Sequence, residues 1–130
     1  MNIVMDTHIF YWYINQDSQL DRHIKTALDN ADKLFVSSAT CVELGLLVDK
    51  GRIELDTPYL EWFDEVLSDT DIEFLDISPN IANLSTILPE HHKDLVDRLI
   101  IATALIHGCD LASVDTKFPL YQELNNKLIH

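Results

Sequence analysis

The sequence predicts an α/β fold in which a parallel sheet carries helices on both faces. Short apolar segments of strand length alternate with longer helical segments along the chain. Two of the apolar segments end directly before an aspartate, at Asp6 and Asp115. With 130 residues, 47% of them hydrophobic, the chain suffices for one domain, residues 1–130, with its own core. Alternation of this kind is typical of parallel sheets that are covered on both faces.

The first expected strand covers residues 2–5 and ends at Asp6, which is followed by Thr7 and His8. Two interpretations of Asp6 are open from this segment. In the first, Asp6 serves only as the cap of a helix that begins near Thr7. In the second, it is a functional acid at the carboxyl end of a strand. The next helix has four aromatic residues at positions 10–13. Core packing is their favoured role, and a dimer or partner surface is the second.

The third expected helix contains an unusual acid. The elements before and around it are an amphipathic helix over 18–30, a strand over 34–36, and a helix that is capped by Ser37 or Ser38 and runs to Lys50 before Gly51. Glu43 is the only charged residue from Val36 to Val48. A lone carboxylate is costly to bury unless it is paired or bound to a metal. The alternative is a solvated helix face near the positive end of the dipole.

The second half of the chain repeats the alternation. We expect a helix with its cap in Asp56-Thr57 and Pro58 in its first turn, a strand over 72–77, and a helix from Ser78-Pro79 to Pro89. A helix from Asp94 to Gly108 and a strand over 111–114 follow. Asp94 suits the N-cap of its helix, and Asp97 follows three residues later. Asp115 comes directly after the last strand.

Composition limits the classes of function. The formal net charge is −13, from 9 basic and 22 acidic residues, which argues against broad phosphate neutralisation and permits an acidic metal pocket or a basic partner. The first residues lack the pattern of a signal peptide, and no apolar run spans a bilayer. We therefore expect a cytoplasmic protein without a membrane contact. Cys41 and Cys109 are expected as reduced, buried thiols.

Four acids are expected to meet at the carboxyl edge of the sheet: Asp6, Glu43, Asp97 and Asp115. Crowded carboxylates repel one another unless protons or cations neutralise them, and oxygen ligands favour hard cations such as Mg²⁺ or Mn²⁺. Two such ions about 4 Å apart orient water and stabilise both oxygens of a phosphodiester displacement. The pattern thus indicates a metal-dependent nuclease.

Five segments carry a resemblance to a known family: Asp6-Thr7-His8, Ser38-Ala-Thr-Cys-Val-Glu43, Lys50-Gly51-Arg52, His92-Lys-Asp94-Leu-Val-Asp97-Arg98-Leu99 and Ser113-Val-Asp115. Their order and spacing resemble the PIN-domain family, and within it the toxin-type ribonucleases of bacterial toxin-antitoxin modules. The resemblance implies a three-layer PIN-like fold with a sheet ordered about 3-2-1-4, often with a short fifth strand.

The resemblance also implies a set of functions. Asp6, Glu43, Asp97 and Asp115 would bind the metal, and the hydroxyls of Thr7 and Ser113 would support the site. The expected activity is hydrolysis of single-stranded RNA that leaves 5′-phosphate ends. The expected partners are a cognate antitoxin and a second copy of the chain. Leu95 stands where relatives often have proline, and Ser113 where threonine is commoner.

Several nearby residues have a second interpretation. Asp94 is expected to act mainly as a cap, and His92 to lie in a loop near the substrate. The pair His91-His92 does not indicate zinc, because adjacent histidines point in different directions. The cations near the acidic edge, Arg98, Lys50, Arg52 and Lys117, either touch phosphate or form solvated salt bridges.

Three rival classes share part of the pattern. A phosphoacceptor receiver domain needs paired acids after the first strand, whereas this chain has Asp6 alone. A phosphatase of the haloacid-dehalogenase type needs a second aspartate at the position of His8. A catalytically silent binding module on the PIN scaffold remains open, although all four expected acids are present.

Overall fold

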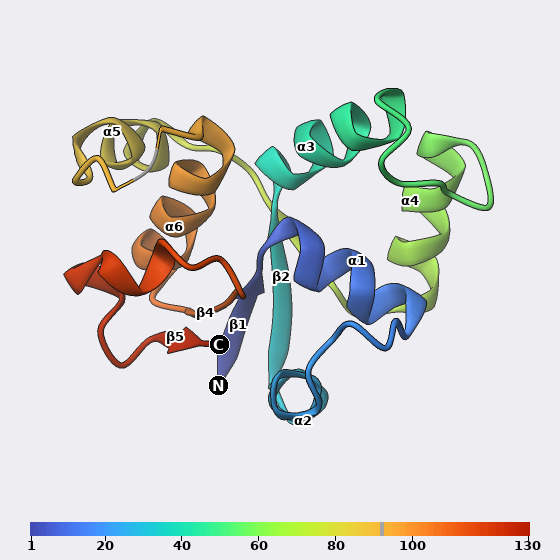
Figure 1. The fold of residues 1–130 in the computed structure, drawn as a ribbon, viewed down its shortest axis with the longest axis horizontal. Helices are drawn as coiled ribbons and strands as arrows, with labels where there is room; N and C mark the ends of the chain where they lie inside the picture. The colour runs from blue at the N-terminus through green and yellow to red at the C-terminus, as the bar shows by residue number, and fades with distance from the viewer. Residues whose placement is uncertain (92) are drawn as a thin grey trace.

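The computed structural model describes residues 1–91 and 93–130. The described residues form a five-stranded parallel sheet in the order β3-β2-β1-β4-β5 (Figure 1). Its strands are β1 Asn2–Met5, β2 Lys33–Ser37, β3 Glu73–Leu75, β4 Asp110–Ala112 and β5 Leu128–Ile129. The predicted order and the short fifth strand are thus confirmed.

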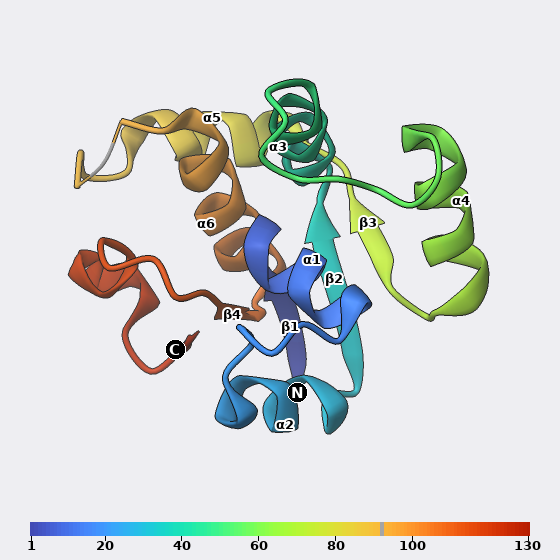
Figure 2. The same cartoon turned by 45° about the vertical axis from the view of Figure 1, so that its right-hand side comes forward.

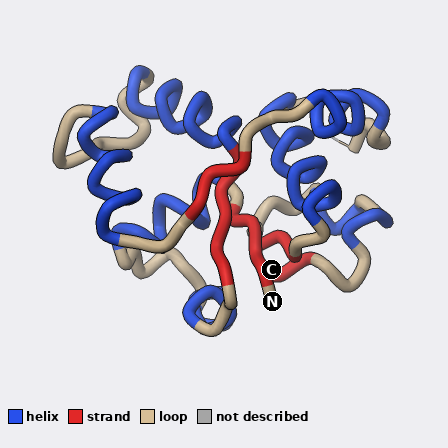
Figure 3. The backbone as a smooth tube through the Cα atoms, turned by 180° about the vertical axis from the view of Figure 1, so that it is seen from behind, coloured by secondary structure: helices blue, strands red, loops and turns tan. Residues whose placement is uncertain are grey.

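Helices cover both faces of this sheet, as predicted. They are α1 Thr7–Asn15, α2 Arg22–Asp29, α3 Ser38–Asp49, α4 Tyr59–Asp69, α5 Pro79–Ile87 and α6 Leu95–His107, with short 3-10 turns η1 Phe118–Leu120 and η2 Gln122–Leu124. Helices α1 and α4 lie on one side of the strands and α5 and α6 on the other (Figure 1), and the turned view brings α1 in front of β1 and β2 (Figure 2). The view from behind shows the strands between these two groups (Figure 3). No helix in the described ranges has the length and apolar character that a membrane crossing requires.

The two layers follow from alternation along the strands. Ile3 and Met5 of β1 pack into a core with α1, α2 and α4, while Val4 between them packs into a second core with α5 and α6. All three are fully buried. Successive side chains of a strand point to opposite faces, so a continuous apolar strand requires apolar helices on both sides.

Phe10 anchors the first core. Its ring meets Trp62 and Phe63 of α4 and Phe74 of β3, with centroid separations of 5.7, 6.4 and 6.2 Å. It is fully buried, whereas the other aromatic residues of α1 are half-buried. Core packing, the favoured role of the aromatic helix, is therefore confirmed for Phe10.

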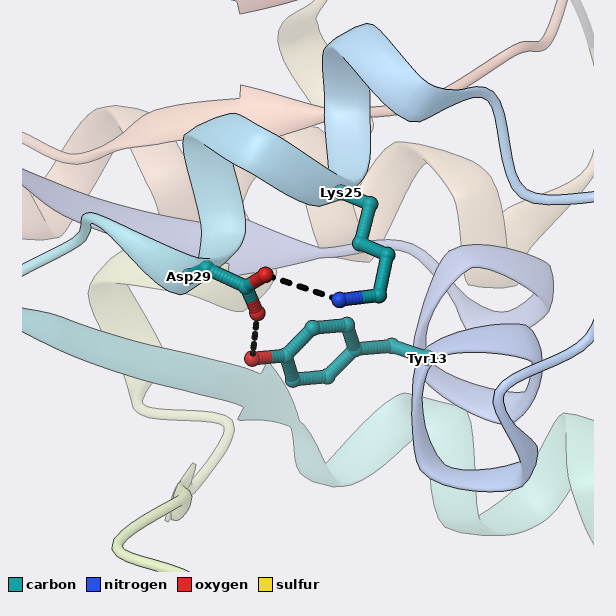
Figure 4. A network of polar contacts seen from close by, with 3 residues as sticks. All are labelled: Tyr13, Lys25 and Asp29. Carbon is teal, nitrogen blue, oxygen red and sulfur yellow. Dashed lines mark hydrogen bonds and ion pairs between the residues drawn. The ribbon is translucent and has the colours of Figure 1, made fainter.

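A polar network joins α2 to α1 (Figure 4). The Tyr13 hydroxyl donates to Oδ1 of Asp29 at 2.8 Å, and Lys25 Nζ donates to Oδ2 at the same distance. Burial and the hydrogen bond to the carboxylate raise the pKa of Tyr13 to about 12. Tyr13 therefore acts as a neutral donor that holds α2 beside α1.

The second helix is shorter than predicted. Instead of starting at Ser18, α2 begins at Arg22, because residues 17–20 form a turn in which Leu20 N–H donates to the Asp17 carbonyl. Asp21 then caps the helix by accepting from His23 N–H. Leu20 is nevertheless buried, which explains why it fits the apolar stripe of the sequence.

Smaller differences concern the ends of elements. The predicted strand over 72–77 is confined to 73–75, and the strand predicted over 111–114 covers 110–112. Ser37 caps α3 by accepting from Ala39 N–H, which decides between the two serines. Pro58 is itself the N-cap of α4 and lacks a side-chain capping bond, so the expected cap by the preceding residues is wrong.

Candidate active site

The acids gather where the chain order of the sheet reverses. From β1 the chain continues to β2 and β3 on one side, whereas β4 and β5 lie on the other. Asp6 follows β1 directly, and Ser113 and Asp115 follow the neighbouring β4. Open α/β sheets form their ligand sites outside the carboxyl ends of strands at such a switch point.

Asp6 caps α1 and also stands at the carboxyl end of β1, so its position is compatible with both interpretations of the sequence. Its Oδ1 accepts from Ile9 N–H at 2.9 Å and so caps α1. Its Oδ2 accepts from the Ser113 hydroxyl at 2.5 Å. Burial raises the pKa of Asp6 to about 6, against the lowering effect of these two hydrogen bonds. Capping therefore fixes the carboxylate without removing it from the acidic cluster.

Three carboxylates from α3 and the start of α6 lie closest together. One oxygen each of Glu43, Asp94 and Asp97 can be chosen so that all lie within 4.8 Å of one another. Asp94 caps α6, accepting from Val96 N–H at 2.9 Å. The predicted capping role is confirmed, but Asp94 also belongs to the cluster, where the sequence interpretation gave it only support.

The acids lie close enough together for their charges to affect one another's ionisation. The pKa of Asp97 is raised to about 8, first by burial and then by the charges of Asp94, Glu43, Asp115 and Asp6. Like charges at short range disfavour ionisation. The structure therefore brings together all four predicted acids and Asp94. A hollow of about 230 Å³ is lined by Asp6, Thr7, His8, Glu43, Asp94, Asp97, Val114 and Asp115.

The two predicted supporting hydroxyls are both buried at this site. Ser113 joins two acids, because its Oγ donates to Asp6 and accepts from the backbone N–H of Asp115 at 3.0 Å. Thr7 Oγ1 lies 3.2 Å from Thr40 Oγ1 and so joins α1 to α3, the helix of Glu43. Both side chains thus connect elements that carry acids.

Arg98 has a different environment from the expected phosphate contact or solvated salt bridge. Its side chain is 7% exposed and donates to the carbonyls of Ser85, Leu88 and Pro89 at 2.9, 2.7 and 3.0 Å. These carbonyls lie at the end of α5, where backbone acceptors lack helical partners. Arg98 therefore holds the end of α5 against α6.

Three of the six histidines lie in or directly beside the sequence segments that carry the acids. His92 falls outside the described residues, so its expected place near the substrate is not tested. His91 is exposed, and the centroid of its ring lies 4.6 Å from that of the Tyr121 ring. His8 lines the hollow, which the sequence interpretation did not assign. Its place directly after Asp6-Thr7 was the available signal, because that position opens the helix at the strand end.

Comparison with known proteins agrees with this geometry. A family model described as PIN domain matches residues 3–124. The chain belongs to the PIN-domain family. Among relatives of this PIN domain is Ribonuclease VapC22 of Mycobacterium tuberculosis, 31% identical over 116 residues and covering 88% of each chain.

Solved structures share the fold of this PIN domain. The VapBC2 structure from Rickettsia felis, bound to a promoter DNA fragment, has a TM-score of 0.71 at 19% identity and covers 99% of this chain and 98% of its own. A toxin-antitoxin complex from Klebsiella pneumoniae has a TM-score of 0.67 at 21% identity, with coverage of 98% and 96%. FitAcB from Neisseria gonorrhoeae gives 0.65 at 19% identity, with the same coverage.

Proposed function

We propose that this PIN domain is a metal-dependent endoribonuclease that cleaves single-stranded RNA. The observation that carries the proposal is the meeting of five carboxylates around one hollow at the switch point of the sheet. Similarity to a protein named as a ribonuclease supports RNA as the substrate. A hydrolase without a covalent intermediate fits the hollow, which is lined by carboxylates and carries no cysteine or serine among its described lining residues.

The donor set fits a hard divalent cation. The described lining offers carboxylate oxygens from five residues, which is the ligand chemistry that Mg²⁺ and Mn²⁺ prefer. Glu43, Asp94 and Asp97 would hold one ion, because their oxygens already lie within 4.8 Å of one another. Asp6 and Asp115 would complete the site from the ends of β1 and β4. When bound, the cation would neutralise these carboxylates and withdraw charge from the phosphodiester.

The protein itself would position the reacting groups. Asp6 is held by Ser113 and Ile9, so its carboxylate has a fixed direction at the strand end. Glu43 would accept a hydrogen bond from the attacking water. In hydrolysis the water oxygen bonds to phosphorus, the bond to the 3′-oxygen breaks, and that oxygen takes a proton. The products would carry 5′-phosphate and 3′-hydroxyl ends.

Cleavage of a mixed single-stranded RNA pool tests the proposal. The purified protein is assayed with Mg²⁺, Mn²⁺ or EDTA beside Asp6→Asn and Asp97→Asn, and product ends are identified. We expect metal-dependent cleavage that both substitutions reduce at least about a hundredfold. Asp76→Asn, an exposed acid after β3, is the matched control and should cleave like the parent. Cleavage that persists in EDTA or in Asp6→Asn would contradict the proposal.

We also propose that the protein is the toxin of a toxin-antitoxin pair. Similar folds occur in the VapBC2 structure and in the toxin-antitoxin complex from Klebsiella pneumoniae, and the net charge of −13 favours a basic partner. An antitoxin side chain such as arginine would enter the acidic hollow and compete with the metal. Affinity capture of the tagged protein from its native cells should return a small basic protein that inhibits cleavage. If the captured proteins did not inhibit cleavage, this result would contradict the assignment as a toxin.

A homodimer is the proposed assembly. Val42 and Leu46 lie one turn apart on α3 and are 58% and 50% exposed, and paired apolar side chains of this kind favour association. Light scattering of the parent and of Val42→Asp with Leu46→Asp tests this. A dimeric parent and a monomeric variant are expected, and a monomeric parent would contradict the proposal.

A further inference from the structure

A second hollow with a partly different lining lies beside the acidic hollow. The second hollow measures about 520 Å³ and shares Asp94, Asp97, Val114 and Asp115 with the first. Its other lining residues are Lys93, Thr116 and Lys117. The four shared lining residues place the two hollows next to each other. The cationic side chains of the second hollow, among the described residues, come from the loop before α6 and the loop after β4.

The two lysines are notable in so acidic a protein. Two of the other lysines, Lys25 and Lys33, form ion pairs with carboxylates at 2.8 and 3.0 Å. Lys93 and Lys117 are exposed, and within residues 1–91 and 93–130 neither has a carboxylate within ion-pair distance. Asp94 and Asp115 line the same hollow, so anionic partners are near but do not take up these ammonium groups. Both lysines therefore remain available to an anion that enters from solvent.

We propose that Lys93 and Lys117 form a phosphate subsite beside the acidic hollow, which binds a backbone phosphate next to the scissile one. The ligand class is a single-stranded polynucleotide, and the inference rests on the function proposed above. A strand with its scissile phosphate at the carboxylates would extend past Val114 into the second hollow. Two ammonium groups and the Thr116 hydroxyl would then face the neighbouring phosphate. Val114 is 46% exposed and offers an apolar contact to the nucleoside between the two phosphates.

Charge explains why such a subsite is needed here. Five carboxylates line the first hollow, and a bound cation would offset part of their charge at the scissile phosphate only. The neighbouring phosphate would still face Asp94 and Asp115, which line both hollows. Lysines in the lining of the same hollow would offset that repulsion. Phosphate contacts of this kind set the register of a strand without reading its sequence.

Equilibrium binding tests the subsite apart from catalysis. Every protein carries Asp6→Asn, so that RNA is bound with Mg²⁺ present but not cleaved. Anisotropy of a labelled single-stranded oligonucleotide is compared for the parent background, Lys93→Gln with Lys117→Gln, the two arginine replacements, and Lys33→Gln. Lys33 is the matched control, because it lies at the amino end of β2 and thus at the opposite edge of the sheet.

The double glutamine variant should bind the oligonucleotide about tenfold more weakly. The slope of log affinity against log salt should fall by roughly 0.7 for each lost phosphate contact to a single strand. Lys93→Arg and Lys117→Arg should retain the affinity and the salt slope of the background, since arginine keeps the positive charge. Lys33→Gln should match the background. Equal affinity and slope in the double glutamine variant, or an equal loss in Lys33→Gln, would overturn the subsite.

Cleavage kinetics add a second readout on proteins with native Asp6. On long RNA, the double glutamine variant should raise KM and leave kcat unchanged. On a dinucleotide, which has one phosphodiester and nothing to place in the subsite, the variant should match the parent. A fall of kcat on both substrates would overturn the subsite, whereas failure of Asp6→Asn to stop cleavage would instead remove the proposed function.

Discussion

The hydroxyl of Ser113 donates a hydrogen bond to Oδ2 of Asp6, which joins residues 107 positions apart in the chain. The bond lowers the pKa of Asp6 in opposition to burial, the larger effect. Ser113 also accepts from the backbone N–H of Asp115, so that one buried side chain orients two acids of the cluster. It therefore supports both the direction and the ionisation of the carboxylate at the end of β1.

Ser113→Ala should weaken Mn²⁺ binding in a pH-dependent manner. Without the hydroxyl, the pKa of Asp6 should rise above its present value of about 6, and metal ligands must be deprotonated. Calorimetric titration should show the defect near pH 6.5 and its reduction near pH 8.5. Ser85→Ala removes another buried hydroxyl, one that donates to Ala82, and should leave metal binding unchanged. A defect of the same size at both pH values would contradict this role of Ser113.

Without metal, the folded protein should lose stability as pH rises from about 4 to about 8. The pKa of Asp97 is raised from 3.8 to about 8 and that of Asp6 to about 6, so the folded chain holds more protons than the unfolded chain in this range. Stability therefore falls as pH increases, because the unfolded state releases those protons first. Thermal unfolding in EDTA should show a Tm several degrees lower near pH 8 than near pH 4.

Asp97→Asn should flatten that pH profile and raise the Tm of the metal-free protein near pH 8, because it removes one of the repelling charges. Asp29 serves as the control. Lys25 and Tyr13 lower its pKa, so Asp29→Asn loses favourable contacts and should not raise the Tm. A metal-free protein whose stability increases over this pH range would contradict the repulsion.

Asp94 allows capping and metal binding to be separated. Asparagine caps a helix about as well as aspartate and lacks the charge that repels Asp97, so Asp94→Asn should not lower the Tm, while Mn²⁺ affinity should fall several-fold. Asp94→Ala should lose the helix cap and the metal ligand together, and the lost cap should lower the unfolding free energy by about 1 kcal/mol. Urea unfolding and metal titration measure the two quantities. Full Mn²⁺ affinity in Asp94→Asn would show that Asp94 only caps α6.

Arg98→Lys should destabilise the fold by roughly 2–4 kcal/mol, because an ammonium group cannot replace the planar donors that bind three carbonyls. Urea unfolding in EDTA measures this without the contribution of metal binding. Arg52→Lys, an exposed substitution of the same kind, should change the unfolding free energy by less than about 0.5 kcal/mol. Equal stability of the two variants would contradict the carbonyl contacts as a stabilising feature.

The order of strands and helices, and the acids at strand ends, could be predicted from the periodicity of the sequence. The apolar runs around Val4 and Leu111 predicted buried parallel strands, and the acids after those strands predicted one edge for Asp6 and Asp115. The start of α2 was not predictable from its apolar stripe, because Leu20 packs into the core from a turn. Tertiary contacts of this kind leave no local signal.

The roles of Asp94 and Arg98 show a second limit. A residue that caps a helix satisfies the local pattern completely, so nothing in the sequence indicates that the Asp94 carboxylate also lies close to Glu43. The carbonyls that receive Arg98 come from a different helix, and only the packing of α5 on α6 brings them within reach. The sequence left a phosphate contact and a solvated salt bridge open for Arg98, and neither describes this buried environment.

The single-turnover rate of RNA cleavage as a function of Mn²⁺ concentration tests the central claim most directly. It is measured for the parent, for Glu43→Gln from the acidic hollow, and for Glu73→Gln as an exposed control on β3. We predict a rate that requires Mn²⁺, a loss of about a hundredfold or more in Glu43→Gln, and a parent-like curve for Glu73→Gln. A rate independent of Mn²⁺, or a Glu43→Gln curve that overlays the parent, would contradict a carboxylate-held metal centre as the seat of the activity.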